Sequence, residues 1–156
     1  MADIAAADLF ARHYRDIYRF LARMTGRRDL ADDLSQEVFL HAVRALDSGV
    51  GAVRHERGWI FSIARHLLTD HHRREQRRPV AVPPVAESAV GAGQELALEL
   101  ADALGRLPEA DREVFLLKEM GGLSYEQIAE TCGCTAESVH ARLYRTRLAL
   151  RAMLSV

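Results

Sequence analysis

The sequence is poor in features of exported, membrane-embedded or disulfide-stabilised proteins. Its 156 residues include only two cysteines, Cys132 and Cys134. Two thiols cannot complete a tetrahedral zinc site alone. Free cysteine is among the most buried residue types, so we favour structural cysteines over a redox sensor. No apolar run approaches the ~20 residues of a membrane helix. Residues 1–9 lack the basic and apolar segments of a signal peptide, so we expect a cytoplasmic protein.

Proline is also scarce, and its placement divides the chain. Three of the four prolines fall within residues 79–84, in a segment without helical periodicity. Prolines at this density exclude a helix and favour an extended, semi-stiff spacer. The sequence therefore predicts two domains, residues 5–78 and 94–154, joined by a proline-rich linker at residues 79–93.

Both predicted domains show helical rather than strand periodicity, because apolar residues recur at steps of three and four. The first helix should end at Thr25-Gly26, Asp29 should cap the second, and Trp59 should open the third. After the linker, helix should resume near Gln94 and again after Leu107-Pro108. We therefore predict an all-α fold of two small helical domains.

The C-terminal segment has the pattern of a helix-turn-helix. Ser124 and Gln127 have the spacing of a capping box, and Gly133 allows the chain to leave a short helix. Thr135 should cap a longer helix. Its inward residues are predicted to be Val139, Leu143, Leu148 and Leu150. Its outward residues are predicted to be His140, Arg142, Tyr144, Arg145, Arg147 and Arg151. Such a second helix would lie in a DNA major groove.

Charge is unevenly distributed, although the net charge is only −1. No acidic residue follows Glu137, whereas four arginines do, so the last helix lacks acidic partners of its own. This favours DNA binding over a plain helical hairpin with a solvated face. Residues 65–78 are a second basic cluster. The acid-rich residues 95–130 could be a surface for a basic protein partner or a solvated face.

Residues 29–39, 58–74 and 107–130 follow each other in an order and pattern that together resemble the extracytoplasmic-function group of the sigma-70 family. Residues 29–39 (DLADDLSQEVF) resemble the segment that binds core polymerase. Residues 58–74 (GWIFSIARHLLTDHHRR) resemble the promoter-melting and minus-10 helix. Residues 107–119 (LPEADREVFLLKE) and 122–130 (GLSYEQIAE) resemble the segment leading into minus-35 recognition. The resemblance covers nearly the whole chain and implies sigma domains of the region 2 and region 4 types.

The resemblance implies a sigma factor that binds core RNA polymerase and directs promoter-specific initiation. The implied polymerase-binding residues are Asp33, Gln36, Glu37 and Phe39. Core packing is favoured for Phe39, and a solvated face is the alternative for the others. The implied minus-10 residues are Arg65, His66, Asp70, Arg73 and Arg74. The implied minus-35 residues are Thr135, Ser138, His140, Ala141, Arg142, Tyr144 and Arg145. Residues 48–57 correspond to a base-capturing loop.

The resemblance also implies partners and a location. Promoter DNA and an anti-sigma factor would join the polymerase as partners, and the active protein would associate with the nucleoid. Many relatives carry Lys or Arg where His140 stands. A neutral imidazole has one donor and one acceptor, so it lacks the bidentate grip of arginine on guanine. We therefore expect a different minus-35 preference.

Two other functions were weighed. A helix-turn-helix regulator that does not act as a polymerase subunit would need a sensor domain, generally of α/β pattern, which the first 78 residues do not show. An enzyme could use Asp32-Asp33 or His71-His72 with Glu75. However, adjacent helical residues point about 100° apart, and neither doublet converges on one ion or atom. We expect no catalytic activity, cofactor or metal.

Overall fold

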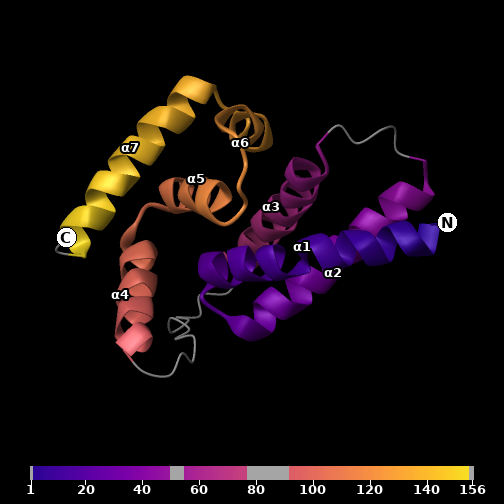
Figure 1. Ribbon diagram of the computed structural model, residues 1–156, viewed down its shortest axis with the longest axis horizontal. Coiled ribbons are helices and arrows are strands. Elements are labelled where there is room, and N and C mark those ends of the chain that lie inside the picture. Colours follow the sequence, from indigo (N-terminus) through magenta and orange to yellow (C-terminus); the bar gives the residue numbers. More distant parts are fainter. Residues whose placement is uncertain (1, 50–54, 77–91, 155–156) are drawn as a thin grey trace.

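The computed structural model describes residues 2–49, 55–76 and 92–154, and this part of the chain consists of helices and short turns without strands (Figure 1). The helices are α1 (Ala2–Thr25), α2 (Arg28–Asp47), α3 (Glu56–Glu75), α4 (Ala92–Arg106), α5 (Glu109–Glu119), α6 (Tyr125–Cys132) and α7 (Ala136–Met153). The all-α prediction is confirmed. Most of the predicted linker lies outside the described residues.

Helices α1, α2 and α3 pack around an aromatic and aliphatic core. Phe20 of α1 meets Phe61 of α3 edge to face, with ring centroids 5.5 Å apart. Both rings, with Ile17 and Val38, are fully buried. Burying each such side chain favours folding by about 1.5–3 kcal/mol. This core fixes the directions in which α2 and α3 expose their polar faces.

The C-terminal helices continue this core with buried side chains that include Leu117 of α5, Ile128 of α6 and Leu143 of α7. On α7 the buried residues are Val139, Leu143, Thr146 and Leu150. They follow each other at steps of four, three and four residues, which keeps them on one helical face. Leu148 falls outside that sequence of steps and is 48% exposed, so its predicted inward position was wrong.

Two predicted helix starts were also wrong. Helix α2 begins at Arg28 with Arg27 as its N-cap residue, and no side chain caps it. Asp29 lies inside the first turn, where its carboxylate accepts a hydrogen bond of 3.0 Å from Arg27. Helix α3 begins at Glu56, one turn before Trp59. The apolar residue Trp59 was a poor marker of the start of α3, because the first turn of a helix can lack apolar side chains.

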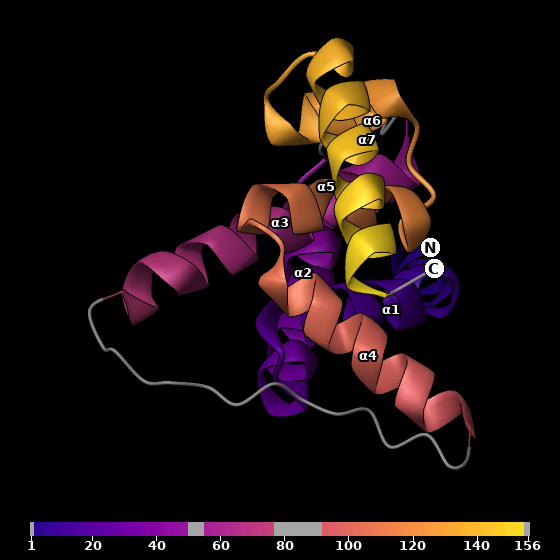
Figure 2. The same cartoon turned by 90° about the vertical axis from the view of Figure 1, so that its left-hand side faces the viewer.

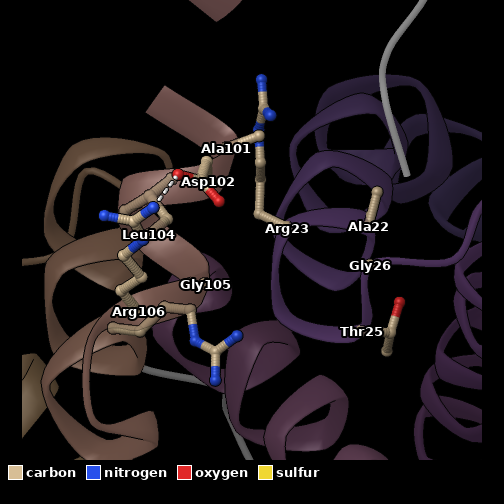
Figure 3. A pocket seen from close by; sticks show the side chains of 10 residues that line it. Ala22, Arg23, Thr25, Gly26, Ala101, Asp102, Leu104, Gly105 and Arg106 are labelled. Carbon is tan, nitrogen blue, oxygen red and sulfur yellow. Dashed lines mark ion pairs between the residues drawn. The ribbon is translucent and has the colours of Figure 1, made fainter. Parts of the chain in front are cut away.

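The two groups of helices contact each other, with α5 lying between α7 and the N-terminal helices (Figures 1 and 2). Helix α1 packs on α5, and α3 packs on α6. A pocket of about 330 Å³ remains between the end of α1 and helices α4 and α5. Arg23 of α1 and the ion-paired Asp102 and Arg106 of α4 line it (Figure 3). The two groups of helices therefore pack closely where α3 meets α6 and leave a pocket beside α4.

Candidate nucleic-acid interface

The turn between α6 and α7 is built from local hydrogen bonds. The Ser124 hydroxyl accepts from the Gln127 backbone N–H at 3.1 Å, and the Gln127 side chain accepts from the Ser124 N–H at 2.9 Å. The predicted capping box is confirmed. Gly133 then adopts a left-handed conformation with φ 67°, and the Cys134 N–H bonds back to the Ala129 carbonyl. Glycine is favoured there because it has no Cβ.

Thr135 caps α7, as predicted. Its hydroxyl oxygen accepts a hydrogen bond of 3.1 Å from the backbone N–H of Ser138. Both residues were also predicted to contact minus-35 DNA. The cap leaves the Thr135 side chain exposed, while Ser138 is half-buried. Thr135 therefore has a demonstrated role in starting the helix, beside the predicted one in binding.

The first turns of α7 present one continuous exposed face. It carries His140, Ala141, Tyr144 and Arg145. Tyr144 is 68% exposed, so its side chain is available to a binding partner. Arg142 lies beside this face and is half-buried. The structure therefore brings the predicted base-reading positions together on the outer side of the second helix.

The arginines of α7 have acidic neighbours on α5. The Arg145 guanidinium lies 3.4 Å from the Asp111 carboxylate, and that of Arg147 lies 3.5 Å from Glu119. The absence of acidic partners within α7 did not predict these pairs, because both acids belong to α5. The Arg147–Glu119 pair is exposed on both sides, and such pairs are worth about 0–1 kcal/mol, whereas the Asp111 side chain is only 13% exposed.

Helix α3 presents a second polar face. His66, Asp70, Arg73 and Arg74 are all exposed and follow each other at helical spacing. Arg65, predicted to belong with them, points elsewhere. Its guanidinium donates to the Glu113 carboxylate of α5 at 2.6 Å, and the Arg65 side chain is 30% exposed. The structure thus groups four of the five predicted minus-10 residues and separates Arg65 from them.

The same Glu113 carboxylate accepts a hydrogen bond of 3.4 Å from the Cys132 thiol. Burial, and then the nearby carboxylate charge, raise the pKa of Cys132 to about 12. Since the thiolate is the reactive species, a thiol held protonated is a poor redox sensor. Both cysteines are free and half-buried rather than fully buried. Among the described residues, no group of three or more His, Cys, Asp or Glu side chains could hold a metal ion.

Helix α2 exposes Asp33, Gln36 and Glu37 on one side. Phe39 is only 7% exposed and packs against Phe10 of α1, with ring centroids 5.2 Å apart. Its predicted place in the core is confirmed. Leu40, which was not predicted to belong to this face, is 53% exposed and lies on the same side of α2 as Asp33, Gln36 and Glu37. The sequence could have predicted this position of Leu40, because residues seven positions apart lie on the same face of a helix.

Arg57, at the start of α3, was also missed. Its guanidinium donates to the Asp16 carboxylate at 2.6 Å and to the Met120 carbonyl at 3.0 Å. It also donates to the Gly121 carbonyl. The two carbonyls lie at the end of α5, where the helix dipole is negative and favours a cation. Arg57 therefore connects the two domains. The rest of the predicted base-capturing loop lies partly outside the described residues.

The fold and the two basic faces define a two-domain helical protein with a helix-turn-helix. Family descriptions match in the same order: Sigma-70 region 2 over residues 9–78 and Sigma-70 region 4 over residues 97–150. The ECF RNA polymerase sigma factor SigC of Mycobacterium tuberculosis is 33% identical over 144 residues, covering 88% of this chain and 77% of SigC. The sigma factor YlaC of Bacillus subtilis is 29% identical over 156 residues, covering 92% and 88%.

Two solved structures share the fold. One is the sigma factor RpoE with the anti-sigma factor NepR from Bartonella quintana, with a TM-score of 0.78, 24% identity and coverage of 100% and 99%. The other is CnrH with the cytosolic domain of CnrY, with a TM-score of 0.77, 26% identity and coverage of 98% and 89%.

The chain belongs to the extracytoplasmic-function RNA polymerase sigma factors of the sigma-70 family. These relatives support a sigma factor over a helix-turn-helix regulator that acts apart from the polymerase. In the part of the chain that the structure describes, every helix is too short or too polar to cross a membrane.

Proposed function

We propose that this sigma factor divides promoter recognition between two domains, residues 5–78 and 94–154. Asp33, Gln36 and Glu37 of α2 would bind core polymerase. His66, Asp70, Arg73 and Arg74 of α3 would meet the minus-10 element. The predicted minus-35 residues of α7 would enter the major groove. The observation that carries the proposal is the presence of two exposed basic faces, one on each side of the predicted linker.

In this proposal the packed arrangement of the domains opens before both elements are read. The elements are separated by ~25 base pairs, or ~85 Å of B-form DNA at 34–36 Å per turn. A compact chain of this length has a radius of gyration of ~15 Å and is ~40 Å across. A linker of about 15 residues can span at most ~50 Å. Separated domains can therefore cover a distance that the packed form cannot.

Tethering explains how two weak readers can be selective. Once one domain is bound, the linker turns the second contact into an intramolecular event with a raised effective concentration. Capture of an unpaired base costs a few kcal/mol, which the capturing site and the polymerase must supply together. The protein itself makes or breaks no covalent bond in this scheme and is not an enzyme.

We place the protein in the cytoplasm, at the nucleoid when active, because core polymerase and promoter DNA are its proposed partners. The solved RpoE structure contains an anti-sigma factor, and CnrH is seen with the cytosolic domain of CnrY. By analogy, an anti-sigma factor that covers the polymerase-binding surface is proposed as a third partner.

Transcription in vitro with purified core polymerase and a promoter library tests the proposal. Wild-type protein should direct initiation from a defined set of sequences. Replacing Arg73 and Arg74 with Ala should reduce initiation, whereas Arg19→Ala, at an exposed position of α1, should not. Failure to form a complex with core polymerase, or initiation independent of promoter sequence, would contradict the proposal.

A further inference from the structure

The His140 ring on α7 does not stand free in solvent. Its centroid lies 3.8 Å from that of the Tyr125 ring, and the two planes are inclined by 52°. Tyr125 is the first residue of α6, so the contact joins the two helices of the helix-turn-helix. An exposed histidine on a single helix would sample several rotamers. Contact with a neighbouring ring limits this freedom.

Tyr125 is itself held in place. It is half-buried and packs against the core of the C-terminal domain. The ammonium group of Lys118 lies 5.1 Å from the Tyr125 ring centroid, within range of a cation–π interaction. The same ammonium lies 3.4 Å from the Leu123 carbonyl and donates to it. Tyr125 is therefore a supported platform rather than a second mobile side chain.

This support bears on base recognition because a neutral imidazole has only one donor and one acceptor. An arginine can bind guanine through two parallel hydrogen bonds, and its planar guanidinium group defines the directions of both. A histidine has no such second bond, so the direction of its ring edge must be set by the protein. Restricting the ring before binding also lowers the entropy lost when DNA is bound.

We propose that Tyr125 is a positioning residue for minus-35 recognition, which orients the His140 imidazole so that its nitrogen edge reads one base pair. The inference rests on the proposed function and deepens it. Tyr125 need not touch DNA in this role. The base pair concerned offers a hydrogen-bond acceptor or donor in the major groove, as the N7 and O6 atoms of guanine or the amino group of cytosine do.

The test uses the full-length protein bound to core polymerase and a set of promoters that vary one minus-35 base pair at a time. His140→Ala first identifies the base pair whose discrimination depends on His140. Tyr125→Leu keeps apolar bulk against the core but removes the ring. It should reduce discrimination at that same base pair by roughly two- to tenfold, the range expected for an aromatic contact. Tyr125→Phe, the matched control, should retain it.

The double variant Tyr125→Leu/His140→Ala should discriminate no worse at that base pair than His140→Ala alone, since the platform acts only through the histidine. A second readout needs no DNA. The ring-proton NMR signals of His140 should be displaced by the neighbouring ring in the wild type and in Tyr125→Phe, but not in Tyr125→Leu.

Three outcomes would overturn the inference. Tyr125→Leu could weaken all promoters equally without altering base preference, which would indicate a structural role. Tyr125→Phe could be as damaging as Tyr125→Leu, which would indicate a DNA contact by the hydroxyl. His140→Ala could leave base preference unchanged while the wild type still selects promoters, so that the proposed function stands without this reader. Loss of promoter-directed transcription by the wild type would instead refute the proposed function itself.

Discussion

Replacing Arg57 should separate the two domains. The guanidinium forms two hydrogen bonds to carbonyl oxygens at the end of α5 and is oriented by its ion pair with Asp16. A hydrogen bond to a charged group contributes about 1.5–3 kcal/mol. Because the Arg57 side chain is 31% exposed, we discount each of the two bonds to about 1–1.5 kcal/mol. Arg57→Ala should thus weaken the packed form by about 2–3 kcal/mol.

A loss of this size shifts the balance between packed and separated domains by roughly 30- to 150-fold. Small-angle X-ray scattering should show a larger radius of gyration, and residues of the predicted linker should be cut faster by protease. If polymerase binds only separated domains, its apparent affinity for the variant should also rise. Arg74→Ala, an exposed arginine on the same helix, provides the matched control.

The reasoning would be refuted if Arg57→Ala and Arg74→Ala gave the same scattering curve and the same cleavage rate as the wild type. Arg57→Lys adds a further discrimination. Lysine keeps the positive charge near the α5 dipole but cannot direct two fixed N–H groups at separate carbonyls. Arg57→Lys should therefore increase the radius of gyration by an intermediate amount if hydrogen-bond geometry matters. It should leave the radius unchanged if the positive charge alone holds the domains together.

Three further predictions concern local chemistry. Gly133→Ala should lower the free energy of unfolding by about 1–2 kcal/mol in urea titrations, because φ is 67° while an added Cβ would meet no atom within 4 Å; an unchanged midpoint would contradict this. Glu56→Gln should destabilise by up to about 1 kcal/mol at pH 7. Hydrogen bonding to Arg12 lowers the pKa of Glu56 from its usual 4.5, so the charged carboxylate contributes its full stabilisation above pH 4.5. The difference from wild type should vanish as the pH falls through the lowered pKa; a constant difference would count against it. Glu113→Gln should lower the raised pKa of Cys132 and speed its alkylation at pH 9. An equal rate in the two proteins would exclude the carboxylate as a cause.

The helix-turn-helix was predictable because its signals are local. Ser124 and Gln127 lie three residues apart, as do Thr135 and Ser138, and Gly133 acts on its own backbone. Each of these features follows from the chemistry of one or two side chains. Packing against the rest of the chain therefore changed these caps and this turn little.

The surroundings of the arginines were not predictable in the same way. Arg65 and Glu113 are 48 residues apart, and Arg57 and Gly121 are 64 apart. No periodicity within a helix encodes such a partner, because it depends on how the second domain docks on the first. Arg65 was therefore predicted to lie with the exposed residues of α3, and Arg57 was predicted only as the last residue of the base-capturing loop.

The docking gives the acidic residues of α5 a definite place. Asp111 and Glu119 face arginines of α7, while Glu113 faces Arg65 of α3. The open alternatives for the acid-rich segment were a surface for a basic partner and a solvated face. In the described structure these three acids pair instead with basic residues of α3 and α7, the two helices proposed to bind DNA. The Arg147–Glu119 pair is exposed on both sides and weak, whereas the Arg65–Glu113 pair is shorter and partly buried, and the Asp111 carboxylate is only 13% exposed. If α7 binds DNA as proposed, a phosphate can replace Glu119 beside Arg147 with little rearrangement, whereas release of Arg65 requires the domains to part.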